Sequence, residues 1–188
     1  VFSMELKGKK INFLGDSITY GHGTSSPDKR FSDLIAKNEG AVVRNYGING
    51  TTVAFDPTKA VGQSFCERVS SMDPDADIIV IFGGTNDASA RSPIGEYQYS
   101  DWTKEDCKSF RPALACLFDM LMKRYPDAKI YSILNSELRE EINESCRVVC
   151  GHYGIQLIEL HDIEKQNGHP SVKGMKSICD QLLEAIVD

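Results

Sequence analysis

Five short apolar runs recur along the chain, and segments with helical periodicity separate them. The runs are rich in Val and Ile and show little alternation of polar and apolar residues, which is typical of strands buried on both faces. We therefore predict strands over residues 10–14, 41–46, 78–82, 129–134 and 155–159.

The segments between and after these strands carry apolar residues at helical spacing. They predict helices over residues 28–38, 61–70, 107–124, 137–153 and 171–187. Pro126 and Gly154 are suited to end the third and the fourth of them. Alternating strands and helices predict an α/β fold, a three-layer α/β/α sandwich around a five-stranded, parallel, flavodoxin-like sheet.

The length and composition of the chain favour a single domain over residues 1–188. The chain has 188 residues, of which 41% are hydrophobic and 26% charged, which is the balance of an ordinary globular protein. A net charge of −6 gives no basic surface for nucleic acid or an anionic membrane. No apolar run approaches the length of a membrane span, and the N-terminus lacks a signal-peptide core. We expect a cytoplasmic protein without nucleic-acid or membrane partners; the oligomeric state stays open.

The six cysteines do not form a recognisable metal motif. No Cys-x-x-Cys pair is present, and no histidine lies at ligand spacing to a cysteine pair, so no metal or other cofactor is expected. Several of the cysteines fall in apolar helical stretches, which favours buried free thiols over disulfides. They are Cys66, Cys107, Cys116, Cys146, Cys150 and Cys179.

Four short polar segments stand where active-site residues are expected in such a fold. The first strand runs directly into Gly15-Asp16-Ser17-Ile18-Thr19, which places the Ser17 hydroxyl at a strand-to-helix turn. The second and third strands run into Asn45-Tyr46-Gly47-Ile48-Asn49-Gly50-Thr51-Thr52 and Gly83-Gly84-Thr85-Asn86-Asp87. Since the carboxyl ends of parallel strands meet at one edge, Ser17, Gly50 and Asn86 are predicted to gather there. The fourth segment, Gly168-His169-Pro170-Ser171, lies near the C-terminus.

In this order and at these distances, the four segments closely resemble the signature blocks of the SGNH hydrolase (GDSL-like esterase/lipase) family. The resemblance extends from Lys10 to about Leu183. It implies Ser17 as nucleophile and His169 as general base. It also implies Gly50 as a backbone donor, and Asn86 as a side-chain donor, to the oxyanion of the tetrahedral intermediate.

Each of these residue types suits the chemistry of ester hydrolysis. A hydroxyl becomes nucleophilic when a base takes its proton, and the oxyanion needs several hydrogen-bond donors. The backbone N–H of Ser17 is one candidate donor, and the neutral Asn86 amide cannot compete for the serine proton. Gly47 is a competitor of Gly50 for the backbone donor, although Gly50 matches the family spacing better.

The third member of the catalytic triad departs from the family pattern. An Asp is expected three residues before the histidine, and Gln166 occupies that position. Our preferred candidate for orienting His169 is Glu164, followed by Asn167 and Asp162. A Ser17–His169 dyad assisted by a backbone carbonyl is a further alternative.

One long loop breaks the alternation and should overhang the active edge. Residues 88–106 contain Tyr97, Tyr99 and Trp102, the only tryptophan of the chain. These aromatic side chains either line the substrate pocket or fill a surface groove as packing.

Taken together, these features predict a carboxylic ester hydrolase of the serine esterase type. We expect it to act on small acyl esters, above all O-acetyl groups on carbohydrates, through an acyl-enzyme; thioesterase and arylesterase activities are its closest rivals. The alternative from another class is a catalytically weak module of the same fold that binds carbohydrate through Tyr97, Tyr99 and Trp102. It stays open because the Asp expected three residues before His169 is missing. A nucleotide binder is disfavoured, since no phosphate-binding fingerprint is present.

Overall fold

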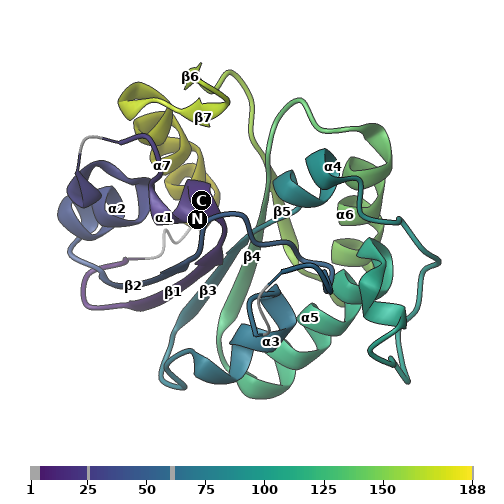
Figure 1. The fold of residues 1–188 in the computed structure, drawn as a ribbon. Helices are drawn as coiled ribbons and strands as arrows, with labels where there is room; N and C mark the ends of the chain where they lie inside the picture. The colour runs from purple at the N-terminus through teal and green to yellow at the C-terminus, as the bar shows by residue number, and fades with distance from the viewer. Residues whose placement is uncertain (1–4, 25, 60–61, 188) are drawn as a thin grey trace.

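The computed structural model describes residues 5–24, 26–59 and 62–187. A five-stranded parallel sheet forms its centre, with the strands in the order β2-β1-β3-β4-β5 (Figure 1). The strands are β1 (Lys10–Gly15), β2 (Val42–Gly47), β3 (Ile78–Phe82), β4 (Lys129–Leu134) and β5 (Gln156–Glu159). All five predicted strands are present, each within one residue of its predicted ends.

Helices cover both faces of the sheet and create two hydrophobic clusters. On one face, α2 (Phe31–Glu39) and α7 (Val172–Val187) pack over side chains such as Phe13 and Val80. On the other face, α3 (Phe65–Arg68), α5 (Phe110–Arg124) and α6 (Glu140–Tyr153) pack over Leu14, Ile79 and Ile81. Every side chain of β3 is buried, which explains why its sequence shows no polar alternation. The predicted three-layer α/β/α fold is confirmed.

Several predicted helices are shorter than their hydrophobic pattern suggested. The first begins with a separate 3-10 turn, η1 (Pro27–Lys29), because Arg30 is extended before α2. The second consists of α3 and the 3-10 turn η2 (Val69–Ser71), and its predicted start at Val61 lies outside the described residues. The third is divided into η3 (Asp106–Lys108) and α5, because Ser109 is extended between them.

Three small elements lie at the carboxyl edge of the sheet, and only the first of them, at the strand-to-helix turn of Ser17, was indicated by the sequence. They are helix α1 (Ser17–Tyr20), helix α4 (Thr85–Ala90), and an antiparallel hairpin of β6 (Lys165–Gln166) and β7 (His169–Pro170). Figure 1 shows the hairpin and α4 at the same end of the molecule, above the tips of the strand arrows. These elements carry the residues that the sequence singled out.

The six cysteines are all free thiols, as their helical setting indicated. Three of them are buried (Cys146, Cys150 and Cys179) and three are partly buried (Cys66, Cys107 and Cys116). Within the described ranges, no helix combines the length and the apolar composition that a membrane span requires.

Candidate active site

Ser17 begins α1 directly after β1, and the tight turn between them requires glycine at position 15. A Cβ atom on Gly15 would lie 2.0 Å from Thr19 Oγ1, so any side chain at position 15 would push α1 away from the strand. Asp16 caps the short helix, since its Oδ1 accepts a 3.0 Å hydrogen bond from the Ile18 N–H. The turn therefore holds Ser17 at the carboxyl edge of the sheet, and its hydroxyl is only partly buried.

His169 reaches Ser17 from the other end of the chain. The Oγ of Ser17 lies 3.1 Å from Nε2 of His169, which is hydrogen-bonding distance. His169 stands in the β6–β7 hairpin, where Gln166 pairs with His169 around the two-residue loop Asn167-Gly168. Both loop residues have positive φ, +53° and +78°, as a type I′ turn requires and as an Asn-Gly pair allows. The turn chemistry of this pair thus sets the position of the predicted base.

The other nitrogen of His169 faces a backbone oxygen. Its Nδ1 lies 3.3 Å from the carbonyl oxygen of Asn167, across the tight turn. A carbonyl can only accept a hydrogen bond, so this contact favours a proton on Nδ1 and leaves the lone pair of Nε2 facing Ser17. Of the alternatives left open by the sequence, the geometry matches the dyad assisted by a backbone carbonyl.

The structure does not bring our preferred candidate, Glu164, to His169. The Glu164 carboxylate accepts a 2.8 Å hydrogen bond from the Ser171 hydroxyl, and its backbone carbonyl accepts the Ser171 N–H at 3.0 Å. These bonds hold Glu164 at the start of α7. Asp162 is also placed elsewhere, 3.0 Å from Nδ1 of His161 on the surface.

The predicted oxyanion donors do come together. The Asn86 amide, in the first turn of α4, donates a 2.8 Å hydrogen bond to the carbonyl of Thr51, which follows Gly50. Gly50 has φ +75°, a conformation that side chains rarely adopt. The competitor Gly47 is already committed, since its N–H donates to Asn45 Oδ1 at 2.9 Å.

Two buried charged residues hold these loops, and the sequence had given neither a role. Asp87 accepts hydrogen bonds from the backbone N–H groups of Val53 and Ala54, at 2.9 and 3.0 Å. It therefore joins the loop that follows Gly50 to the helix that carries Asn86. Its place beside Asn86 in the third segment was the one available signal.

Arg68, which is also buried, connects backbone segments in a comparable way. Its guanidinium donates to the carbonyls of Gly15 at 3.1 Å and Tyr46 at 2.6 Å, and to the Thr51 hydroxyl at 2.9 Å. It thus ties the end of β1, the end of β2 and the Gly50 loop together. No local pattern identifies such a residue, because these three partners are between 17 and 53 positions away in sequence.

Burial dominates the electrostatics beneath Ser17. It raises the pKa of Asp16 to about 7, against a smaller lowering effect of the hydrogen bond from Ile18. Burial likewise lowers the pKa of Arg68 to about 10 and raises the pKa of Asp87. Proximity to Arg68 partly offsets the cost of charging Asp16.

The aromatic side chains of the long loop are not brought to Ser17, contrary to the substrate-pocket interpretation. Tyr99 stacks on His152 with ring centroids 3.6 Å apart, at the C-terminal end of α6. That end points away from the active edge, because the helices run antiparallel to the strands. Tyr97 lies under the Arg111 guanidinium at 4.2 Å, and Trp102 donates to the Gln98 carbonyl at 3.0 Å. All three pack against the hydrophobic cluster beside α5 and α6, so the structure matches the packing alternative.

His22 is the aromatic residue that does reach the site. Its ring centroid lies 4.6 Å from that of His169, with the two planes tilted by 55°. Gly23 is close as well, since a Cβ atom built on it would lie 3.7 Å from Cβ of His169. The loop after α1 therefore supports one face of the predicted base.

The chain is similar to known proteins in both sequence and fold. The sequence matches the model of the GDSL-like Lipase/Acylhydrolase family over residues 10–186. A crystal structure described as a GDSL-like lipase from Bacteroides uniformis is 40% identical, with 95% of each chain covered and a TM-score of 0.88. Another from Bacteroides ovatus is 38% identical, with 95% of this chain and 98% of that chain covered and the same TM-score.

A more distant match shares the fold alone. It is a carbohydrate esterase family 2 enzyme of Corynascus, 16% identical, with 99% of this chain and 68% of that chain covered and a TM-score of 0.72. The sequence matches no curated protein. The family match over nearly the whole chain, together with the two Bacteroides structures, establishes that this protein belongs to the GDSL-like lipase/acylhydrolase family of ester hydrolases.

Proposed function

We propose that the protein is a serine esterase that hydrolyses small acyl esters through a covalent acyl-enzyme. The observation that carries this proposal is the 3.1 Å contact between Ser17 Oγ and His169 Nε2 at the carboxyl edge of the sheet. Nε2 takes the hydroxyl proton as the Ser17 oxygen attacks the ester carbonyl carbon. His169 then gives that proton to the leaving alcohol. In the second half, His169 takes a proton from a water molecule, the water oxygen attacks the acyl carbon, and the proton passes to the Ser17 oxygen as it leaves.

The oxyanion of each tetrahedral intermediate needs donors already in place. We assign these to the backbone N–H groups of Ser17 and Gly50 and to the side-chain amide of Asn86. Ser17 opens α1, so its N–H has no acceptor within the helix. The Asn86 amide donates one hydrogen to the Thr51 carbonyl, and its second hydrogen is the proposed donor to the oxyanion. Loss of one such donor typically lowers turnover by about 10²–10³-fold.

The Asn167 carbonyl replaces the usual triad carboxylate in this scheme. Changing a triad Asp to Asn costs about 10⁴ in turnover, because the amide favours the wrong imidazole tautomer. A backbone carbonyl cannot donate, so it keeps the proton on Nδ1 and retains the productive tautomer. It stabilises the imidazolium less than a full negative charge would, so we expect a lower turnover than a complete triad gives.

We propose an O-acetyl group on a carbohydrate as the substrate. The fold-level similarity to a carbohydrate esterase supports this class by analogy. A catalytically weak carbohydrate-binding protein of the same fold is the second candidate, favoured because no carboxylate of the described residues contacts Nδ1 of His169.

Labelling with a fluorophosphonate probe, read by intact mass, tests the catalytic assignment. We expect one label per chain in the parent protein and none in Ser17→Ala, which should also lose hydrolysis of p-nitrophenyl acetate. Ser89→Ala is the matched control, since Ser89 is an exposed serine in α4, one turn from Asn86. Labelling that persists in a folded Ser17→Ala protein would remove Ser17 as the nucleophile, and an unlabelled, folded parent would favour the binding protein.

A further inference from the structure

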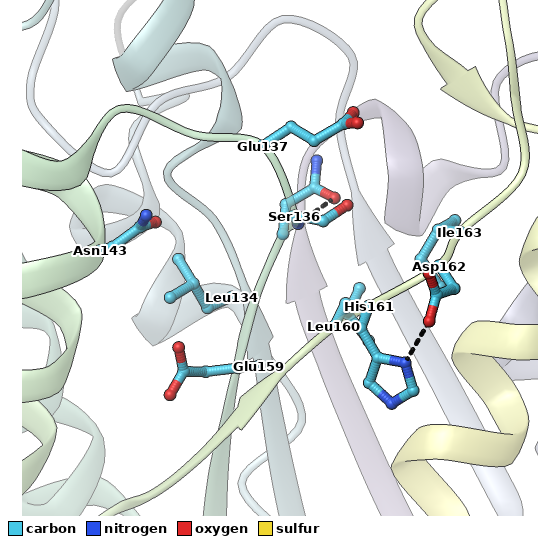
Figure 2. A pocket seen from close by; sticks show the side chains of 10 residues that line it. Leu134, Ser136, Glu137, Asn143, Glu159, Leu160, His161, Asp162 and Ile163 are labelled. Carbon is cyan, nitrogen blue, oxygen red and sulfur yellow. Dashed lines mark hydrogen bonds and ion pairs between the residues drawn. The ribbon is translucent and has the colours of Figure 1, made fainter.

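A polar cavity of about 450 Å³ opens at the carboxyl ends of β4 and β5, outside the Ser17–His169 pair. Figure 2 shows its wall, formed by the loop after β4, by Asn143 of α6, and by the end of β5 with the loop that follows. It is lined by Leu134, Asn135, Ser136, Glu137, Asn143, Glu159, Leu160, His161, Asp162 and Ile163.

Hydrogen bonds connect the cavity wall to the two elements that carry Asn86 and His169. The Asn135 amide donates a 3.2 Å hydrogen bond to the hydroxyl of Thr85, the residue before Asn86. On the other side, the Lys165 ammonium lies 3.3 Å from Ser136 Oγ and 3.2 Å from a Glu137 carboxylate oxygen. Lys165 belongs to the hairpin that carries His169. Since neighbouring strands lie about 4.8 Å apart and β4 is two strands from β1, the cavity lies about 10–15 Å from Ser17 along the sheet edge.

The chemistry of the cavity suits a polyhydroxylated ligand. Ile163 offers apolar surface for the C–H face of a sugar ring, whereas Leu134 and Leu160 are almost wholly buried and only close the floor of the cavity. The carboxylates of Glu137, Glu159 and Asp162 offer acceptors for hydroxyl groups. A long acyl chain in the same space would desolvate those carboxylates without replacing their hydrogen bonds, which costs free energy.

One cavity side chain has hydrogen-bonding capacity to spare. Oδ1 of Asn143 is inaccessible to solvent and has no hydrogen-bond partner among the described residues. Its amide nitrogen lies 3.2 Å from the Leu138 carbonyl. The same nitrogen lies 3.3 Å from a carboxylate oxygen of Glu140. A ligand hydroxyl within reach of Oδ1 would supply the missing hydrogen bond.

The backbone of the cavity wall is also unusual. Glu137 and Asp162 have φ of +65° and +53°, in the left-handed region that non-glycine residues seldom adopt. They stand in the two different loops that form the cavity mouth. Strained positions of this kind persist when a site needs a particular loop shape, and here both shape the same cavity.

We infer that this cavity binds sugar units of an oligosaccharide whose acetylated unit lies at Ser17. The inference rests on the proposed esterase function and adds a specificity site to it. A monosaccharide ester would fill the catalytic centre and leave the cavity empty, whereas a longer chain would reach both. The enzyme should therefore prefer acetylated oligosaccharides to acetylated monosaccharides.

The test compares substrates of different chain length in four proteins. Three series of chemically O-acetylated sugars, built from glucose, xylose or N-acetylglucosamine, contain one to four units each. The small ester p-nitrophenyl acetate serves as the reference substrate. The proteins are the parent, Asn143→Leu, Asp162→Gly and the control Asn38→Leu. Asp162→Gly removes the carboxylate at a position where glycine suits the backbone. Asn38→Leu makes the same substitution as Asn143→Leu on an exposed face of α2, away from the cavity.

We expect kcat/KM of the parent to rise with chain length in at least one series. Asn143→Leu and Asp162→Gly should lower kcat/KM for that tetrasaccharide ester by about tenfold, the upper end of what losing one hydrogen bond costs. The same variants should keep the parent rate on p-nitrophenyl acetate, and Asn38→Leu should behave as the parent throughout. A parent that ignores chain length in every series, or cavity variants that keep the preference, would overturn the inference.

Calorimetric titration separates this inference from the proposed function. The unacetylated tetrasaccharides should bind the parent and Ser17→Ala equally and bind Asn143→Leu more weakly. Such binding in a protein without esterase activity would refute the esterase proposal and retain the sugar site. Hydrolysis of p-nitrophenyl acetate without binding of any tetrasaccharide would do the opposite.

Discussion

Asn167 contributes to the site through its backbone, and this changes what its neighbours are expected to do. Nδ1 of His169 lies 3.3 Å from the Asn167 carbonyl oxygen, while the Glu164 carboxylate is engaged with the Ser171 hydroxyl. The identity of the side chain three to five positions before the histidine therefore matters less than the shape of the chain there. A carboxylate in that stretch can be predicted because a sequence shows its side chains, whereas the direction of a carbonyl depends on backbone angles that a sequence does not show.

Glu164→Gln should leave the esterase rate within about threefold of the parent. Gln retains an oxygen that accepts the Ser171 hydroxyl, and the net value of such a bond is about 1 kcal/mol. Steady-state kinetics on p-nitrophenyl acetate, with His169→Gln as the inactive reference, measures this directly. A fall approaching 10⁴-fold, the loss that a triad acid would give, would restore Glu164 as the orienting group.

At the scale of elements, the strands were predictable and the small active-site elements were not. The runs that form β1, β3 and β4 are largely apolar, β3 being almost entirely Ile and Val, and their strands match the predictions within one residue. Helices α1 and α4 have four and six residues, too few for a helical period to show. The hairpin strands have two residues each, yet Asn167-Gly168 between them is the strongest short signal for a type I′ turn and could have revealed them.

That hairpin gives an element-scale prediction for Gly168→Ala. Gly168 has φ +78°, and a Cβ atom there would meet nothing within 4 Å, so the only cost is the left-handed backbone, about 1–2 kcal/mol. We expect the turn to relax and to carry Nε2 of His169 away from Ser17, which lowers kcat at least tenfold with little change in KM. Gly154→Ala is the matched control, because Gly154 has φ +67° and equally open surroundings at the end of α6. If both variants lose stability alike and keep full kcat, the turn does not position the base.

At the scale of the whole molecule, the long-range polar contacts were beyond the reach of the sequence. Arg68 joins β1, β2 and the Gly50 loop, and Asp87 joins that loop to α4. Both are buried charges, which local patterns assign to exposed surface. The family resemblance located the reacting groups, and the three-dimensional structure was needed to find what holds them.

The buried carboxyl of Asp16 should make the stability of the whole fold depend on pH. Burial raises its pKa from 3.8 to about 7, so between these values the folded state holds a proton that the unfolded state has released. The free energy of unfolding therefore falls as pH rises from about 4 to about 7, by up to about 4 kcal/mol from this group.

Asp16→Asn keeps the helix cap and removes the titration, so its stability relative to the parent should increase over that interval. Urea unfolding at pH 4, 5.5 and 7.5 measures the difference, with the exposed Asp127→Asn as control. A constant difference between parent and Asp16→Asn across this range would mean that Asp16 stays ionised in the fold, held by Arg68.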